Sequence, residues 1–124
     1  MAWEKKYLNM MNQWMILKYE NKGIDRYLNK KGYHLIAIYG MAIYGRHVVR
    51  DLEKSNINIA YGIDQKKMKP YKGIEILQPI MILPYADVII NTVVHDQVKI
   101  KSTLEVITNI PILSLEDIIF DAYD

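Results

Sequence analysis

The first part of the chain repeats apolar residues at the spacing of one helix face. Between residues 3 and 19 the apolar side chains fall three or four positions apart, at Trp3, Tyr7, Met10, Met11, Trp14 and Leu17. Such intervals place side chains on one stripe of an α-helix. Gly23 is expected to end this helix, and a second short helix is expected over Ile24–Asn29. We interpret residues 1–30 as a helical N-terminal extension and residues 31–124 as the main domain.

From residue 35 onward, short apolar runs alternate with helical patterns. Strands are expected at 35–39, 57–63, 74–77, 87–93 and 110–113, and helices at 43–54, 97–108 and 114–120. Continuous apolar runs of this length are typical of parallel strands buried on both faces. The alternation predicts right-handed crossovers. The expected fold is a Rossmann-like α/β domain of three layers, with a five-stranded parallel sheet in the order 3-2-1-4-5.

Local signals refine the later elements. Asp96 stands where the helix at 97–108 needs an N-cap, and the Ser-x-x-Asp pattern from Ser114 to Asp117 is a variant of the capping box. The connection from Gln65 to Gly73 is too short for a full crossover helix. We therefore expect one part of a sheet face to lack its usual helix.

The strongest chemical signal is a glycine-containing turn after the first strand. Gly40-Met41-Ala42-Ile43-Tyr44-Gly45 matches the pattern Gly-x-Gly-x-x-Gly, with Ala42 in the second glycine position. It follows a buried strand and opens a helix, which is the context of the dinucleotide-binding fingerprint. Gly40 would form the tight turn, and Gly45 would let the helix pack closely on the strand. The free amides and positive dipole of the helix N-terminus would attract a phosphate.

Two further sets of residues belong to the same expected site. Asp64 ends the second strand nineteen positions after Gly45, close to where the fingerprint places an acid that binds ribose hydroxyls. We expect it at an exposed strand end with little effect on stability. Asn91, Thr92 and Val93 end the fourth strand, beside the point where the strand order reverses and ligands bind.

The nature of the ligand stays open. A carboxylate at position 64 would repel a 2′-phosphate, so a dinucleotide ligand would be NAD rather than NADP. The methyl group of Ala42 would push the backbone away from a pyrophosphate, which suits a single phosphate or a nucleotide sugar better. His95 and Asp96 follow the fourth strand and offer an acid–base pair for a minimal NAD-dependent oxidoreductase. No nucleophile or metal-ligand spacing stands out.

The composition limits the class of protein, its possible partners and its expected location. The chain has 124 residues, 51% of them hydrophobic and 24% charged, which is typical of one globular domain. The net charge of +2 does not indicate nucleic-acid binding, and the chain has no cysteine and therefore no disulfide. No apolar run is long enough to span a membrane. The N-terminus lacks the apolar core of a secretory signal, so we expect a cytoplasmic protein.

Four segments carry a family resemblance: Trp14, Leu17 and Lys18; Gly23, Tyr27 and Leu28; Ile36 to Met41; and Pro111 to Ile119. Together they resemble small Rossmann-like domains encoded among bacterial surface-polysaccharide genes, alone or joined to glycosyltransferases. The resemblance covers nearly the whole chain. It implies a setting in polysaccharide biosynthesis and a glycosyltransferase as a partner.

The sheet region also resembles the N-terminal nucleotide-sugar-binding domain of bacterial sugar acyltransferases. That resemblance implies roles for Gly40, Gly45 and Asp64 in binding the sugar nucleotide. Those enzymes continue into a left-handed β-helix that binds acetyl-coenzyme A, and this sequence contains no such repeat. Acyl transfer is therefore not expected.

Three hypotheses follow from the sequence. The first is a nucleotide- or nucleotide-sugar-binding module without a complete catalytic site of its own, and the second is the minimal oxidoreductase. The third is a structural or docking domain whose glycine turn serves packing alone. The strongly apolar N-terminal helix must be covered, either by the chain's own sheet or by a partner, for which a homodimer is the commonest arrangement.

Overall fold

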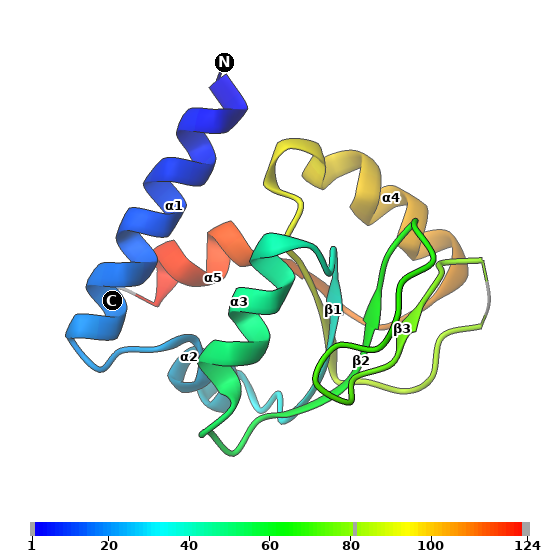
Figure 1. Ribbon diagram of the computed structural model, residues 1–124, viewed down its shortest axis with the longest axis horizontal. Helices are drawn as coiled ribbons and strands as arrows, with labels where there is room; N and C mark the ends of the chain where they lie inside the picture. Colours follow the sequence, from blue (N-terminus) through cyan, green and yellow to red (C-terminus); the bar gives the residue numbers. More distant parts are fainter. Residues whose placement is uncertain (1, 81, 123–124) are drawn as a thin grey trace.

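The computed structural model describes residues 2–80 and 82–122, and its elements follow the order that the hydrophobic pattern predicts (Figure 1). They are α1 (Ala2–Tyr19), α2 (Ile24–Lys31), β1 (Leu35–Tyr39), α3 (Ile43–Leu52), β2 (Asn58–Ile63), β3 (Ile76–Leu77), β4 (Val88–Asn91), η1 (Val94–Asp96), α4 (Gln97–Ile107), β5 (Ile112–Ser114) and α5 (Leu115–Asp121). No helix within the described residues is long and apolar enough to cross a membrane.

The strands form one five-stranded sheet in the order β3-β2-β1-β4-β5, and every neighbouring pair is parallel. This confirms the predicted α/β fold and strand order. Because β1 lies between β2 and β4, the chain leaves β1 toward one edge of the sheet and later returns to the other side of β1. The carboxyl ends of β1 and β4 are therefore the point where the strand order reverses.

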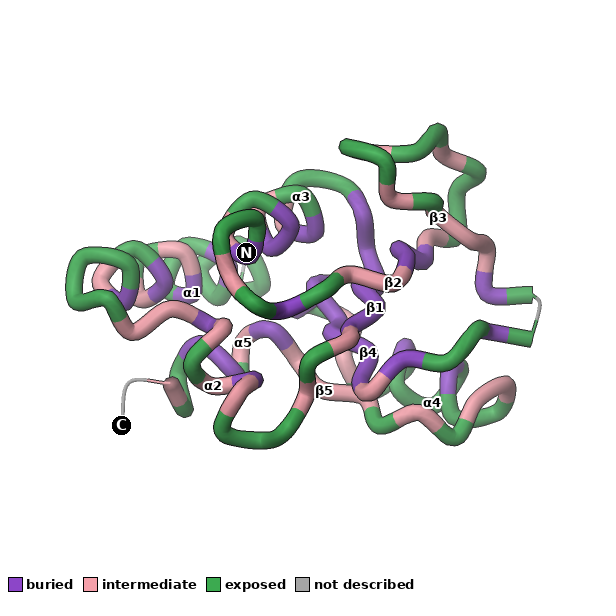
Figure 2. The backbone as a smooth tube through the Cα atoms, turned by 90° about the horizontal axis from the view of Figure 1, so that it is seen from below, coloured by how far each residue is buried: buried purple, intermediate pink, exposed green. Residues whose placement is uncertain are grey.

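Residues of the central strands alternate between the two faces, as the period of a strand requires. Ile36 and Ile38 of β1 belong to one buried cluster, together with residues of α1, α2, α3 and α5. Ala37 and Tyr39 belong to a second cluster with Ile100 and other residues of α4 and of the loop before β4. Figure 2 shows buried residues along β1 and β4 and on the inner sides of the helices. The sheet is thus covered on both faces.

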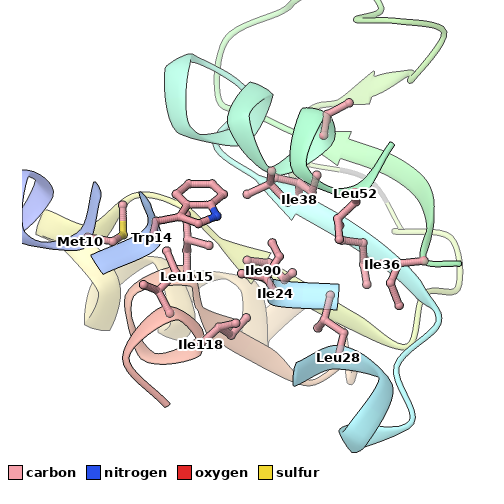
Figure 3. Close-up of a cluster of buried hydrophobic side chains, with 14 of the residues drawn as sticks. Met10, Trp14, Ile24, Leu28, Ile36, Ile38, Leu52, Ile90, Leu115 and Ile118 are labelled. Atoms are coloured by element: carbon pink, nitrogen blue, oxygen red, sulfur yellow. The ribbon is translucent and has the colours of Figure 1, made fainter. Parts of the chain in front are cut away.

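Helix α1 packs on the chain's own fold, which was one of the two expected arrangements. Tyr7, Met10, Trp14 and Leu17 are buried, and α1 lies along α5 and beside η1. Figure 3 shows Met10 and Trp14 close to Leu115 and the other core residues of this face. The residues of α1 and α2 therefore share one core with the main domain.

α1 does not pack on the part of the sheet face that the short connection after β2 is expected to leave without a helix. The loop between β2 and β3 covers that place itself, with Met68, Tyr71 and Ile74 packed against the core. α1 packs beside α5 instead, because the apolar residues of α5 need cover on the same face of the sheet. Of the predicted stripe, Trp3 stays 40% exposed.

The predicted capping roles of Asp96 and Ser114 are wrong. Both residues stand at the N-cap positions, of α4 and α5 respectively, but neither side chain makes a capping hydrogen bond. The 3-10 turn of η1 leads directly into α4 and leaves Asp96 with a backbone unsuited to capping. The hydroxyl oxygen of Ser114 is buried without a hydrogen-bond partner among the described residues.

The burial of α1 leads to a first prediction. Leu17→Ala removes a fully buried side chain, so we expect the free energy of unfolding to fall by about 3 kcal/mol. Leu8→Ala on the same helix is the matched control, because Leu8 is 69% exposed, and its effect should stay within about 0.5 kcal/mol. Urea denaturation measures both variants. Equal losses would contradict the packing of α1 on this core.

A second prediction concerns the start of β1. One oxygen of Asp87 accepts the N–H groups of His34 and Leu35 at 2.8 and 2.9 Å, and the other accepts the hydroxyl of Tyr85. The Tyr85 hydroxyl first, and then the two amides, lower the pKa of Asp87 below its ordinary value of 3.8. Because the pKa of Asp87 is lower in the folded state than in the unfolded state, its ionisation stabilises the fold at any pH above the unfolded-state pKa. This stabilisation is lost as the pH falls through the folded-state pKa.

Asp87→Asn should therefore cost on the order of 1 kcal/mol at neutral pH, and the difference from the parent should shrink below about pH 4. Denaturation of both proteins across this pH range provides the test. Tyr85→Phe removes the largest cause of the pKa shift. In a Tyr85→Phe background, the stability lost on Asp87→Asn should therefore change less with pH than it does in the parent. A difference that is constant with pH would show that the charge of Asp87 does not stabilise the fold.

Candidate functional site

The glycine turn connects β1 to α3 in a geometry that both of its glycines require. Gly40 has a φ of +88°, and a Cβ there would lie 2.5 Å from Oγ1 of Thr92. At Gly45 a Cβ would lie 2.1 Å from the carbonyl oxygen of Gly40. The tight turn at Gly40 and the close packing at Gly45 are thus as the sequence predicts. Both positions exclude larger side chains on steric grounds.

The start of α3 leaves backbone N–H groups without a partner in the helix. The first helical hydrogen bond runs from the N–H of Arg46 to the carbonyl oxygen of Ala42 at 3.2 Å. The preceding amides have no partner within the helix, since the first turn of any helix leaves its N–H groups free. The side chains of Ala42 and Ile43 are exposed and leave this end of the helix open. The positive end of the helix dipole favours an anion there.

Asp64 connects the end of β2 to the glycine turn. Its Oδ2 accepts the N–H of Met41 at 2.9 Å, and its Oδ1 accepts the N–H of Lys66 at 3.0 Å. The residue is half-buried. The expectation of an exposed acid is therefore wrong, because the carboxylate is half-buried and accepts two backbone amides; its small effect on stability stays a prediction. It still lies beside the turn, where the sequence places it.

A cleft of about 480 Å³ opens at the carboxyl ends of the strands, on the side of the sheet that α4 covers. Its walls come from the ends of β1 and β2, from the segment after β4, and from α4. Its size falls within the range of small-molecule sites. The lining residues are Tyr39, Gly40, Asp64, Gln65, Val93, Asp96, Lys99, Ile100, Thr103 and Leu104.

Of the predicted site residues, Gly40, Asp64 and Val93 line this cleft. Asn91 and Thr92 are buried and lie behind its wall. Oδ1 of Asn91 accepts the N–H of Val93 at 2.9 Å, which turns the chain out of β4. Oγ1 of Thr92 lies 2.9 and 2.8 Å from the carbonyl oxygens of Tyr39 and Gly40. Both side chains fix the shape of the turn.

The other predicted residues belong to the turn without lining the cleft. Met41 is fully buried, and its side chain occupies the space beside Gly62 that a Cβ would fill. Ala42 and Ile43 are exposed, and Gly45 lies inside α3. The ring of Tyr44 stacks on Tyr7 of α1 at 4.5 Å, on the other side of the turn.

The cleft contains polar residues that the sequence argument missed. Tyr39 ends β1, and its hydroxyl accepts a hydrogen bond from Nε2 of Gln65 at 3.1 Å. Lys99 and Thr103 of α4 also face the cleft, together with Asp96 of η1, which the sequence predicts only as a helix cap and as half of an acid–base pair. Their spacing of three and four positions gave a signal for this shared face. This spacing points to a ligand site only once α4 is known to cover this side of the sheet.

His95 lies away from the cleft. Its Nδ1 pairs with the hydroxyl of Tyr7 at 2.9 Å, and its ring lies 5.3 Å from that of Trp3. The Tyr7 hydroxyl also accepts the N–H of Val94 at 2.9 Å. Burial raises the pKa of Tyr7, although the hydrogen bonds from the backbone of Val94 and His95 oppose the shift. His95 is thus held against α1 and does not line the cleft, whereas Asp96, its partner in the predicted acid–base pair, does.

The charges of the cleft are mixed. Asp64 and Asp96 offer carboxylates to hydroxyl or amine donors, and Lys99 offers an ammonium group to a phosphate. Across residues 2–80 and 82–122, no three His, Asp or Glu side chains gather as metal ligands. The arrangement can bind a ligand that carries both hydroxyl groups and a negative charge.

Comparison of the sequence with protein-family models, with curated proteins and with solved structures gives no match.

The glycine turn leads to a third prediction. Gly45→Ala places a methyl group against the Gly40 carbonyl, and we expect a loss of about 3 kcal/mol, although alanine is the better helix former by about 1 kcal/mol. Gly73→Ala is the control, because Gly73 has positive φ but open space, and should cost about 1 kcal/mol. Thermal denaturation compares them. A smaller loss of stability in Gly45→Ala than in Gly73→Ala would contradict the close contact between Gly45 and the Gly40 carbonyl.

Proposed function

We propose that this protein is a nucleotide- or nucleotide-sugar-binding module whose ligand occupies the cleft beside the glycine turn. The observation that carries the proposal is the juxtaposition of this turn, Asp64 and Lys99 around one cleft of suitable size. The cleft lies where the strand order reverses, which is the usual ligand site of open α/β sheets.

The chemistry of the cleft suggests how such a ligand would bind. The oxygens of Asp64 each accept one backbone N–H and retain lone pairs, which suit ribose hydroxyl groups. The ammonium group of Lys99 lines the cleft and suits phosphate, whereas the free amides at the start of α3 belong to residues outside the lining. A carboxylate at this place disfavours a 2′-phosphate, so among dinucleotides NAD fits better than NADP.

The alternative of a minimal NAD-dependent oxidoreductase has less support. It requires His95 to act on a substrate held at a subunit interface beside the bound NAD, whereas the histidine lies outside the cleft and packs against Trp3 and Tyr7. A docking domain with a vestigial site remains the competing hypothesis, because the two glycines serve packing as well as access. It predicts that the cleft binds no nucleotide.

The biological setting is part of the proposal and rests on the sequence resemblance. Small Rossmann-like domains among bacterial surface-polysaccharide genes point to nucleotide sugars as ligands and to a glycosyltransferase or a second copy of this chain as a partner. A cytoplasmic location belongs to the same proposal.

A fourth prediction tests the ligand class. A thermal-shift panel of NAD, NADP, UDP- and CMP-sugars and coenzyme A should reveal at least one stabilising ligand. At one hundred times its dissociation constant, a ligand adds about 2.7 kcal/mol to the stability. Absence of any stabilisation, together with absence of a nucleotide retained on purification, would favour the docking domain.

Two lysines of α4 provide a matched pair for the ligand found in this way. Lys99 lines the cleft, whereas Lys101 is exposed and lies outside the lining. Lys99→Met should weaken binding about tenfold, which is the effect of losing one charged hydrogen bond. Lys101→Met should leave the affinity unchanged, as titration calorimetry can show. Equal affinities in both variants would place the phosphate elsewhere.

A further inference from the structure

A second pocket lies on the other side of the glycine turn, between α1, α3 and η1. It encloses about 460 Å³, and four aromatic rings line it, those of Trp3, Tyr7, Tyr44 and His95. None of these four side chains lines the first cleft. The pocket therefore has its own chemistry, independent of the proposed nucleotide site.

The rings are held in place before any ligand arrives. The Tyr7 ring stacks on Tyr44 at 4.5 Å and meets Trp3 edge-on at 6.0 Å. Its hydroxyl accepts the N–H of Val94 and pairs with Nδ1 of His95, both at 2.9 Å. Three elements distant in sequence are thereby locked around the pocket. Such preorganisation lowers the entropic cost of binding.

One carboxylate completes the pocket. Glu4 lies one helical turn before Tyr7 on α1 and is the only acidic residue in the lining, which contains no lysine or arginine. Electron-rich ring faces attract cations, and a carboxylate beside them adds to the attraction. Trp3 remains 40% exposed, so its ring is accessible to a ligand. Among the lining residues, only His95 can carry a positive charge, and only when its imidazole is protonated.

We propose that this aromatic pocket binds a small organic cation, such as a quaternary or alkylated ammonium compound. The rings of Trp3, Tyr44 and His95 line the pocket beside the alkyl groups, and the carboxylate of Glu4 balances the charge. The proposal goes beyond nucleotide binding and does not depend on it, because the pocket shares no side chain with the first cleft.

Choline and its neutral carbon isostere 3,3-dimethylbutan-1-ol are the probes, since they differ in the charge of one atom. ¹H–¹⁵N spectra of the full chain follow the indole N–H groups of the two tryptophans. The Trp3 signal should shift saturably with choline. The Trp14 indole donates to Asp51 at 2.6 Å inside the fold and serves as an internal control. Choline should bind about tenfold more tightly than the isostere.

Matched variants assign the effect to the pocket. Glu4→Gln keeps the shape and removes the charge, and it should weaken choline binding by about fivefold. Trp3→Leu, followed through the backbone amide of Val94, should weaken it by about tenfold. The control is Glu105→Gln on α4, which removes one exposed carboxylate outside the pocket and should leave the affinity unchanged.

Several results would overturn the proposal. Equal affinity for choline and the isostere would show an apolar surface without selectivity for cations. An unchanged affinity in Glu4→Gln, or a choline response that does not saturate, would also exclude the site. Stronger binding of acetyl-trimethyllysine methylamide than of choline would assign the pocket to a protein side chain rather than to a small cation. Nucleotide titrations are scored separately, so the two proposals can fail independently.

Discussion

The close approach of α3 to the end of β1 is the contact on which the rest of this structure depends. The space for a side chain at Gly45 is occupied by the carbonyl of Gly40, so the helix starts directly against the strand. This contact orients the first turn of α3 toward the carboxyl edge of the sheet. It also brings Met41 over β2, where its amide meets Asp64. The geometry of the cleft follows from these constraints.

The N-terminal helix is an integral part of the fold. Trp14 of α1 donates to Oδ2 of Asp51 on α3, and Lys18 binds Oδ1 of the same carboxylate at 2.7 Å. The Asp51 side chain is only 4% exposed, so the two donors compensate for its burial. Tyr7 makes a similar connection to η1. A segment that looks like an extension in the sequence thus packs against α3, α5 and η1 and shares their core.

The glycine turn separates two environments of different character. On the α4 side, carboxylates, an amide and an ammonium group surround the cleft. On the α1 side, aromatic rings and one carboxylate surround the other pocket. Thr92 and Asn91 form the wall behind the turn, with their polar atoms bound to the backbone. Because Tyr44 and Gly40 belong to the same turn, a ligand on either side would contact one continuous segment.

The sequence alone determined the fold class and the place of the turn. The apolar run from Leu35 to Tyr39 followed by Gly40 specifies a buried strand and a tight turn, because both are local properties of the chain. Asp64 was found for the same reason, by its spacing after a strand. Tertiary structure decided which side of the sheet each neighbouring residue faces. His95 and Lys99 are four positions apart, yet one packs on α1 and the other lines the cleft. That choice depends on where α1 and α4 pack, and packing between distant segments is set by the burial of whole faces rather than by local spacing.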